Sequence, residues 1–337
     1  MNKPLISVLL PCYNAEMYVE EAIVSILNQT YTNFELIVIN DCSSDGTRDI
    51  LLKFQKQDSR IILVENEKNL GLVFTLNKGL NLAKGKYIAR MDADDISFPE
   101  RFEKQVDKLE SDEDIVICGG GIISFYQNQN LKPHKRLYPL DTSSIRAEAV
   151  FNTPFAHPCV MMRTSTLIQN NLFYDARYKY SEDYHLWQRL IIYGECANID
   201  DYLLNYRVLS TSQTANGIKN QTERFEKISA IQNIGLKRIG CELNEKQVHF
   251  HYILSLSDYI REIDFTLYDY KFIREYFQSL ESNLADNSYC SASSLRKAFE
   301  RRYLKLVVFN FKRIKFFDRL KFVLGIRFLR SICGYWS

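Results

Sequence analysis

The sequence predicts an α/β protein whose central sheet is mostly parallel and covered by helices on both faces. Apolar runs that suit buried strands alternate four times with segments of helical period within about the first 90 residues, and this order favours a parallel sheet. From Asn220 onward the pattern is helical. We therefore predict a sheet-based domain at residues 1–215 and a helical region at residues 216–337.

The four strands of the first part are short apolar runs bounded by Pro or polar residues. Strands of a parallel sheet are buried on both faces and read as continuous apolar segments. The helices between them carry apolar residues at helical spacing, as Val19, Ala22 and Ile23 do. The predicted strands are Leu5–Leu10, Phe34–Ile39, Arg60–Glu65 and Lys86–Met91, and the predicted helices are Ala15–Gln29, Thr47–Lys56 and Leu70–Ala83.

Beyond Arg101 the alternation becomes less regular. Pro158 lies near the start of one predicted strand, and acids in the first turn of one predicted helix suit the helix dipole. The predicted helices are Pro99–Leu109, Asp141–Val150 and Glu182–Tyr193, and the predicted strands are Ile115–Phe125, Phe155–Arg163 and Tyr202–Val208.

Three carboxylates directly follow the fourth predicted strand, at Asp92, Asp94 and Asp95. Asp92 and Asp94 project to the same side of an extended segment. Two carboxylates at that separation repel each other, and each resists ionising unless a cation shares the site. A hard divalent ion with oxygen ligands, Mg²⁺ or Mn²⁺, meets this need. The alternative is a solvated acidic turn, because Asp is common in turns.

Polar side chains also follow the first two predicted strands, as Tyr13-Asn14 and Asn40-Asp41. Ligands of open α/β sheets bind beyond the carboxyl ends of the strands. A core role does not account for polar residues at three such strand ends. The sequence therefore favours a metal and phosphate site at this edge of the sheet.

Four motifs follow one another within residues 11–184. They are Pro11-Cys12-Tyr13-Asn14, the segment INDCSSDGT at residues 39–47, Asp92-Ala93-Asp94-Asp95 and Ser181-Glu182-Asp183-Tyr184. In this order they resemble family 2 glycosyltransferases of the GT-A fold, of the type that builds bacterial surface polysaccharides. The resemblance covers about residues 4–210. It implies inverting transfer of a sugar from a nucleotide-sugar donor to an acceptor hydroxyl, with UDP the first choice of nucleotide and dTDP the next.

The resemblance also implies a role for the residues at the strand ends. The Tyr13 ring would offer a stacking face to the base. A divalent cation, Mn²⁺ or Mg²⁺, would offset the charge that develops on the departing diphosphate. The nucleotide-binding residues would be Pro11, Tyr13, Asn14, Asp41 and Asp92, and the metal would be held by Asp94 directly and by Asp92.

Asp183 would be the general base, because an inverting displacement needs a carboxylate within reach of the acceptor hydroxyl on the face opposite the leaving group. Glu182 is the alternative base, or orients the acceptor. For both acids, capping of the helix dipole is the structural alternative. The chain departs from the family pattern in two segments: Asn40-Asp41-Cys42-Ser43 stands where relatives often read Asp-Asp-Gly-Ser, and Leu209 stands where a motif often ends in His.

Two further residues are assigned to the acceptor or to phosphate. His157 stands where the family often has a histidine near the acceptor, and a hydrogen-bonded core histidine is the alternative. Arg207 belongs to the segment that ends at Leu209. Arg90 and Arg163 either contact phosphate or pair with acids.

Composition indicates a folded soluble protein, with 46% hydrophobic and 25% charged residues among 337. Eight cysteines show no CxxC spacing, so the sequence carries no readable zinc or redox motif. An undisulfided protein of the cytosol is the simplest account. No stretch approaches the ~18 apolar residues of a spanning helix, and the N-terminal apolar run is too short for a signal peptide.

The C-terminal segment combines basic and aromatic residues. Residues 296–330 hold twelve Lys/Arg and two acids, a net charge of +10, whereas the whole chain carries +2. Such a tail, at about residues 296–337, fits an element that lies on an anionic membrane surface. A helical cap on the catalytic domain is the alternative. Together with the family resemblance, the tail suggests a peripheral protein of the inner face of the plasma membrane. Its acceptor would be a lipid-linked oligosaccharide of capsule, O-antigen or exopolysaccharide synthesis.

Three other functions are weaker. A sugar nucleotidyltransferase needs a glycine-rich loop with a lysine after the first strand, and this chain has Tyr13-Asn14-Ala15-Glu16 instead. A non-catalytic family member is disfavoured because Asp92, Asp94 and Asp183 are all present. A nucleic-acid partner is not expected, because the sequence has no recognisable module for reading bases.

Overall fold

A computed structural model of the chain describes residues 3–209, except 127–130, and residues 220–314, except 262 and 282–287. The chain divides into two compact units. The first comprises the described residues of Met1–Asp141 and Pro154–Lys219, and the second those of Thr142–Thr153 and Asn220–Ser337. The segment Thr142–Thr153 thus groups with the C-terminal helices, whereas the sequence placed it in the first domain. The domain boundary near residue 215 stays a prediction.

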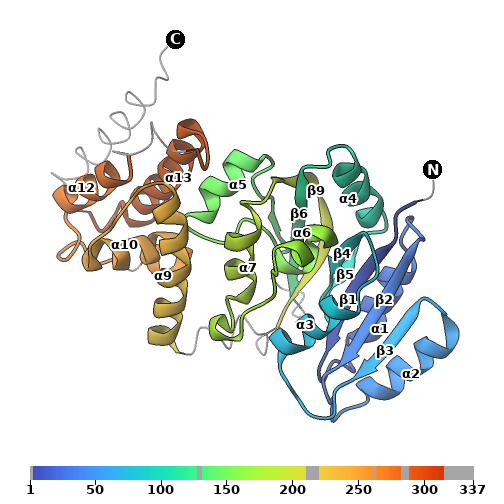
Figure 1. The fold of residues 1–337 in the computed structure, drawn as a ribbon. Coiled ribbons are helices and arrows are strands. Elements are labelled where there is room, and N and C mark those ends of the chain that lie inside the picture. Colours follow the sequence, from blue (N-terminus) through green and yellow to red (C-terminus); the bar gives the residue numbers. More distant parts are fainter. Residues whose placement is uncertain (1–2, 127–130, 210–219, 262, 282–287, 315–337) are drawn as a thin grey trace. The chain divides into compact units, whose positions relative to one another are not determined.

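The first unit is built on one sheet with the strand order β3-β2-β1-β4-β8-β6-β9-β5, and β7 pairs with β6 (Figure 1). The strands β3, β2, β1 and β4 are mutually parallel. Their sequences are apolar because both faces of this part are covered. The strands are β1 (Ile6–Cys12), β2 (Phe34–Asn40), β3 (Ile61–Glu65), β4 (Tyr87–Arg90), β5 (Ile96–Ser97), β6 (Ile115–Tyr126), β7 (His134–Arg136), β8 (Met161–Arg163) and β9 (Glu195–Val208).

Beyond β4 the sheet becomes mixed. β8 runs antiparallel to both β4 and β6, β6 and β9 are parallel, and β5 is antiparallel to β9. The α/β architecture expected from the sequence is therefore confirmed, with a sheet that is parallel in its first part and mixed beyond β4, and the parallel part carries the ends of β1, β2 and β4. These ends lie at one edge of the sheet because the strands are parallel and adjacent.

Helices cover both faces of the parallel strands. On one face, Ile6, Val8 and Leu10 of β1 join a core that includes Ile23 and Ile26 of α1. On the other face, Gly79 of α3 lies so close to Leu9 that an added Cβ would come within 3.1 Å of it. The helices of this unit are α1 (Val19–Leu27), α2 (Thr47–Gln57), α3 (Leu72–Leu82), α4 (Arg101–Glu110), α6 (Thr164–Gln169) and α7 (Glu182–Leu190), with short 3-10 helices η1 (His157–Cys159) and η2 (Ala176–Tyr178).

Two predicted strands differ from the structure. The strand predicted at Phe155–Arg163 is wrong over most of its length, because residues 157–159 form η1 and only Met161–Arg163 form β8. Pro158 lacks the N–H that a central strand needs. The strand predicted at Tyr202–Val208 is the second half of the longer β9. Its register against β6 passes from Gly120↔Ile199 to Gly121↔Tyr202, so two acidic residues between them interrupt the apolar pattern.

The second unit is helical in its described residues. Glu148 pairs with two arginines of this unit: it accepts hydrogen bonds from Arg302 Nη2 at 2.6 Å and from Arg301 Nη2 at 3.2 Å. His251 stacks on Phe151, with 4.5 Å between ring centroids. The helices are α5 (Thr142–Ala149), α9 (Gln221–Arg238), α10 (Glu245–Ser255), α11 (Ser257–Arg261), α12 (Tyr270–Glu281) and α13 (Ala292–Asn310).

The predicted membrane-surface tail is only partly described. In α13, Phe299 and Tyr303 are buried in the second unit, whereas Val308, Phe309 and Phe311 at its end are exposed. Residues 315–337 lie outside the described part of the chain. Among the helices that the structure describes, none is both long enough and apolar enough to span a bilayer.

Candidate active site

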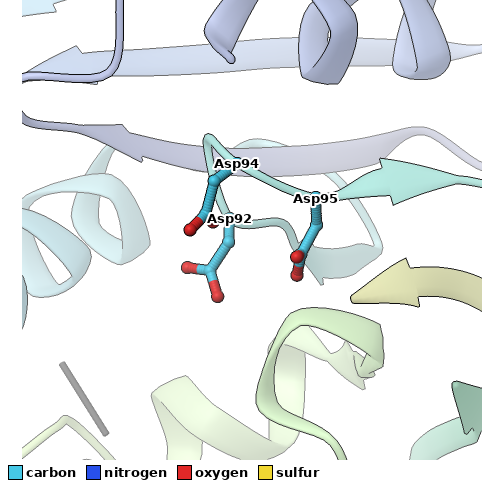
Figure 2. Close-up of side chains that lie close together, drawn as sticks. All are labelled: Asp92, Asp94 and Asp95. Carbon is cyan, nitrogen blue, oxygen red and sulfur yellow. The ribbon is translucent and has the colours of Figure 1, made fainter. Parts of the chain in front are cut away.

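The turn between β4 and β5 brings three carboxylates together. One oxygen from each of Asp92, Asp94 and Asp95 lies within 4.8 Å of the other two (Figure 2). Asp95 is buried, and Asp92 and Asp94 are half-buried. We call these three residues the acidic cluster.

Burial and mutual repulsion make the acidic cluster costly to ionise. Burial and the charge of Asp92 raise the pKa of Asp94 to about 6. Burial raises the pKa of Asp95 well above its usual value, and the charges of Asp92 and Asp94 raise it further. Asp95 Oδ2 has no hydrogen-bond partner among the described residues. Oxygen-only donors with unmet charge fit a hard divalent cation such as Mg²⁺ or Mn²⁺.

Arg90, at the end of β4, supplies the positive charge beside these acids. Its side chain is 3% exposed and forms an ion pair with Asp92. Its Nε and Nη1 have no partner among the residues that the structure describes. Arg163 differs, because it donates from Nε to the carbonyl of Ile115 at 3.0 Å and from Nη2 to that of Leu109 at 2.9 Å. Of the two arginines, Arg90 therefore belongs to the site and Arg163 joins elements of the fold.

A second pair of acids begins α7. Burial and the neighbouring charge of Asp183 raise the pKa of Glu182 to about 7, and burial also raises the pKa of Asp183. Glu182 is buried and its Oε2 has no partner within the described residues, whereas Asp183 is half-buried. Neither side chain is a fully solvated cap of the helix, so helix capping alone does not account for them.

Tyr174, which contacts His157, is influenced by the charges of both groups of acids. Tyr174 Oη and His157 Nε2 are 2.9 Å apart. Burial raises the pKa of Tyr174. The charges of Asp183, Glu182 and Asp92 raise it further, whereas the charge of Arg90 lowers it. Burial and Arg90 hold the pKa of His157 well below its usual value, so the ring is neutral at pH 7. The acidic cluster and the start of α7 are thus within electrostatic reach of one tyrosine.

The loop after β1 is fixed against the loop after β2. Asn14 has a left-handed backbone with a φ of 48°, and its Oδ1 accepts a hydrogen bond from the N–H of Ser44 at 2.9 Å. Glu16 Oε2 accepts from the N–H of Gly46 at 2.6 Å. Tyr13, between these contacts and Pro11, keeps 53% of its surface exposed. An aromatic ring is therefore presented at the edge where β1 and β2 end.

Asp41 is buried and engages the segment before α3. Its Oδ1 accepts from Asn66 Nδ2 at 2.7 Å and from the N–H of Leu70 at 2.8 Å, and its Oδ2 accepts from the N–H of Gly71 at 2.8 Å. Gly71 has a φ of 84°, a conformation that suits glycine. Asp41 therefore shapes this loop, and Oδ2 keeps a lone pair for one more donor.

Arg207, near the end of β9, contacts Asp94 and Asp95, whereas Arg90 contacts Asp92. Its Nε donates to the carbonyl of Asp94 at 2.8 Å, and its backbone N–H donates to Asp95 Oδ1 at 2.8 Å. Its Nη2 donates to Glu21 Oε2 at 2.5 Å. The structure thus gives Arg207 partners within the chain itself.

A sequence comparison identifies the family. Residues 7–205 match the model of glycosyl transferase family 2. The chain belongs to this family. An uncharacterized glycosyltransferase of Haemophilus influenzae is 37% identical to this family 2 glycosyltransferase. The match covers 72% of the present chain and 77% of the relative. The amylovoran biosynthesis glycosyltransferase AmsE of Erwinia amylovora is 31% identical over 69% and 89% of the two chains.

Solved structures confirm the fold of the family 2 glycosyltransferase. The structure of S. aureus TarS 1-349 with UDP-GlcNAc superposes with a TM-score of 0.60 at 17% identity, over 91% of each chain. The mannosyltransferase PcManGT of Pyrobaculum calidifontis, with GDP-Man and Mn²⁺, gives a TM-score of 0.55 at 15% identity, over 90% of this chain and 88% of that one. The predicted family and the GT-A fold are therefore confirmed.

Several residues of the site in this glycosyltransferase carry no local sequence signal. Tyr174 lies 9 positions from Asp183, outside the motif, and Glu21 meets Arg207 across 186 positions. From the sequence, Arg90 either contacts phosphate or pairs with an acid, and in the structure it forms an ion pair with Asp92. The contacts of Tyr174 and Glu21 depend on how distant segments are brought together in the fold, which residue spacing alone does not reveal, whereas Arg90 and Asp92 are only two positions apart.

Proposed function

We propose that this family 2 glycosyltransferase is an inverting, metal-dependent enzyme that takes a sugar from a nucleotide-sugar, with UDP-sugars as the first donors to test. The acidic cluster beside the first turn of α7 carries the proposal. Two groups of acids with raised pKa values, both within reach of Tyr174, match a reaction that needs one carboxylate set for a cation and another for a proton.

Asp94 and Asp92 would hold Mn²⁺ or Mg²⁺, with Asp95 behind them. When bound, the cation offsets the negative charge that builds up on the departing diphosphate. Arg90 forms an ion pair with Asp92, and its Nε and Nη1 have no partner in the described part of the chain. A phosphate oxygen would accept the hydrogen bonds that these nitrogens donate.

Asp183 would take the proton of the acceptor hydroxyl. The acceptor oxygen forms its bond to the anomeric carbon while the bond from that carbon to the diphosphate breaks, and the electron pair leaves with the diphosphate. Glu182, more deeply buried, would orient the acceptor. Neutral His157, held by Tyr174, would lie near the acceptor and donate or accept a hydrogen bond without adding charge.

The ends of β1 and β2 would bind the nucleotide. Tyr13 presents its ring for stacking on the base. Pro11 and Asn14 shape the loop that holds this ring, and the remaining lone pair of Asp41 Oδ2 suits an N–H of a pyrimidine. Stacking is tolerant of the base, so the hydrogen bond to Asp41 would carry the preference for uracil or thymine.

The acceptor would be a lipid-linked oligosaccharide of a bacterial surface polysaccharide. Relatives include an amylovoran biosynthesis glycosyltransferase and an O-antigen biosynthesis glycosyltransferase of Escherichia coli, WbnJ, 35% identical over 62% of this chain. The end of α13 exposes Val308, Phe309 and Phe311 beside Lys312 and Arg313. Apolar and basic groups together favour contact with an anionic membrane surface on the cytoplasmic side.

A donor screen tests the reaction. Purified protein is mixed with UDP-, dTDP- and GDP-sugars, with Mn²⁺, Mg²⁺ or EDTA, and release of nucleoside diphosphate is measured with and without lipid-linked acceptors. We expect release with one donor, loss of that release in EDTA, and inversion of the anomeric configuration by NMR. Metal-independent release or a retained configuration would overturn the mechanism, and no release from any donor would favour a binding protein.

Sedimentation with vesicles tests the membrane contact. The wild-type chain should sediment with vesicles that contain anionic lipid and less with neutral vesicles. Val308→Glu should weaken this binding, whereas Ile168→Glu, at an equally exposed site of the first unit (67% against 66%), should not. Equal binding by both variants would remove α13 from the proposal.

A further inference from the structure

Arg207 lies near the end of β9, and its charged side chain is almost fully buried. Its side chain is 9% exposed. The guanidinium lies over the ring of Phe125 on β6 at 4.6 Å and over that of Tyr18, before α1, at 4.8 Å from each centroid. A buried arginine needs partners for its charge and its donors. The identity of those partners indicates what this arginine does.

Two of its hydrogen bonds end on the turn that carries the acidic cluster. Nε binds the carbonyl of Asp94 and the backbone N–H binds the carboxylate of Asp95, both at 2.8 Å. The contact extends a short ladder, because β5 pairs with β9 in the register Ile96↔Asn205. The carboxyl end of the turn is thus bound to β9 by the backbone pairing of β5 with β9 and by the adjacent contacts of Arg207.

The third hydrogen bond ties this arrangement to another element. Nη2 of Arg207 binds Glu21 in the first turn of α1, whose side chain is 60% exposed. One guanidinium therefore links β9, the β4–β5 turn and the start of α1. The planar fork of arginine makes these bonds at once, which a lysine ammonium cannot do in the same geometry.

We propose that Arg207 is a positioning residue that holds the acidic cluster in the arrangement that binds a divalent cation. The inference rests on the proposed function and gives Arg207 a role other than direct contact with acceptor or phosphate. By binding the Asp94 carbonyl, Arg207 fixes the backbone of the ligand while leaving its carboxylate to the cation. The bond to Asp95 Oδ1 comes from the backbone N–H of the same residue and is retained when the side chain is replaced. Partners of this kind orient metal ligands, and their loss weakens binding of the metal.

Mn²⁺ affinity and loop exchange test the inference in the full-length protein. Free Mn²⁺ is followed by EPR, alone and with UDP, and hydrogen–deuterium exchange is followed for peptides that span residues 92–97. Arg207→Met should weaken Mn²⁺ binding about 10-fold and speed exchange of these peptides. Arg207→Lys, which keeps the charge and loses the fork, should shift both readouts less and in the same direction.

Arg60→Met is the matched control. Arg60 is paired with Asp58 at 2.7 Å and lies over the ring of Phe34 at 4.3 Å, so its loss removes the same kinds of contact elsewhere in the unit. This variant should leave Mn²⁺ affinity and exchange of residues 92–97 unchanged. If Arg207→Met does not fold, the comparison is made with Arg207→Lys.

The outcomes separate the two proposals. If the wild type binds Mn²⁺ and the Arg207 variants bind it equally well with unchanged exchange, the inference is overturned while the proposed function stands. If the wild type binds no Mn²⁺, the proposed metal site fails, and the exchange data alone decide whether Arg207 holds the turn. Faster exchange together with weaker binding, absent from Arg60→Met, supports the inference.

Discussion

Glu148 of the second unit differs from Asp95 and Glu182 of the first unit in how its carboxylate is paired. In the second unit, Glu148 is 14% exposed and both of its oxygens are bound by arginines of α13. In the first unit, Asp95 and Glu182 are also buried, with 1% and 6% of their surface exposed. Asp95 Oδ2 and Glu182 Oε2 nevertheless have no partner among the described residues. A buried acid without partners lowers the stability of a fold. The two acids of the candidate site therefore keep oxygens that a ligand can bind, whereas both oxygens of Glu148 are already bound.

Two Tyr–His pairs repeat this contrast. His251 of the second unit is bonded at both ring nitrogens, to Tyr276 Oη at 2.7 Å and to the carbonyl of Val150 at 3.0 Å. His157 of the first unit has Tyr174 on Nε2 and lies near charged groups instead. The same two residue types thus join helices in one unit and lie within reach of the charges of the candidate site in the other.

The largest effect is expected at the proposed base. Asp183→Asn should lower kcat by roughly 10²–10⁴-fold, the usual contribution of general acid–base catalysis. Its midpoint of thermal unfolding should be unchanged or slightly raised, because the fold raises the pKa of Asp183 and so disfavours the charge that the variant removes. Mn²⁺ affinity serves as the control and should stay the same. Full activity of Asp183→Asn would move the role of base to Glu182.

Loss of a paired acid should act on stability instead. Glu148→Gln leaves two arginine donors without their counter-charge and should lower the free energy of unfolding by about 3 kcal/mol. Glu223→Gln is the control, because Glu223 pairs with Lys227 on the surface of α9, and surface pairs contribute about 0–1 kcal/mol. Urea unfolding measures both. Equal losses would mean that the burial of Glu148 does not matter.

The pH should affect the two units in opposite directions. Burial raises the pKa of Glu182 to about 7, so the stability it contributes is present below pH 4.5 and is lost as the pH rises from 4.5 to 7. Burial lowers the pKa of His251 to about 4, so the stability it contributes is present above pH 6.5 and is lost as the pH falls from 6.5 to 4. Each change amounts to about 3 kcal/mol at most.

Thermal unfolding between pH 4 and pH 8 checks both directions. Glu182→Gln should remove the loss above pH 4.5 and raise the midpoint at pH 8, at the cost of activity. His251→Gln should lower the midpoint overall and remove the loss below pH 6.5. His134→Gln, at an exposed position, is the control. Unaltered slopes in the first two variants would contradict the assignment.

The smallest effect is expected at the tyrosines. Tyr174→Phe removes the hydroxyl that binds His157 and should lower kcat about fivefold, the equivalent of one net hydrogen bond. Tyr276→Phe should instead lower stability by about 1 kcal/mol and leave kcat unchanged. Steady-state kinetics and urea unfolding of both variants distinguish the two roles. A loss of stability without a change in kcat for Tyr174→Phe would make it a core residue.

The sequence predicts the parallel half of the fold well because that half follows simple rules. Apolar runs such as residues 34–39 are continuous where both faces are covered, and the polar groups stand where the strands end. The antiparallel part follows weaker rules. β5 has two residues, too few for a pattern, and the extra Asp200 and Asp201 of β9 break the apolar run from which the strand was predicted.

The acids of the site are readable because they lie in short motifs, but their positioning is not. Asp92 and Asp94 are two positions apart, and Glu182 and Asp183 are adjacent. Which groups surround them depends on strand order. Arg207 reaches Asp94 only because β5 pairs with β9, a pairing across about 110 positions that no local spacing encodes.

The excursion of residues 142–153 limits how the chain can be divided. Ile145, Ala147 and Ala149 of α5 are fully buried within the helical unit, although α5 lies in the sequence between two strands of the other unit. A fragment that stops at residue 215 would retain α5 and lose the helices that cover it. Chimeras that exchange the C-terminal helices between relatives should therefore fold only when residues 142–153 come from the same parent as those helices. We expect substitutions in α5 and in the C-terminal helices to be coupled in evolution.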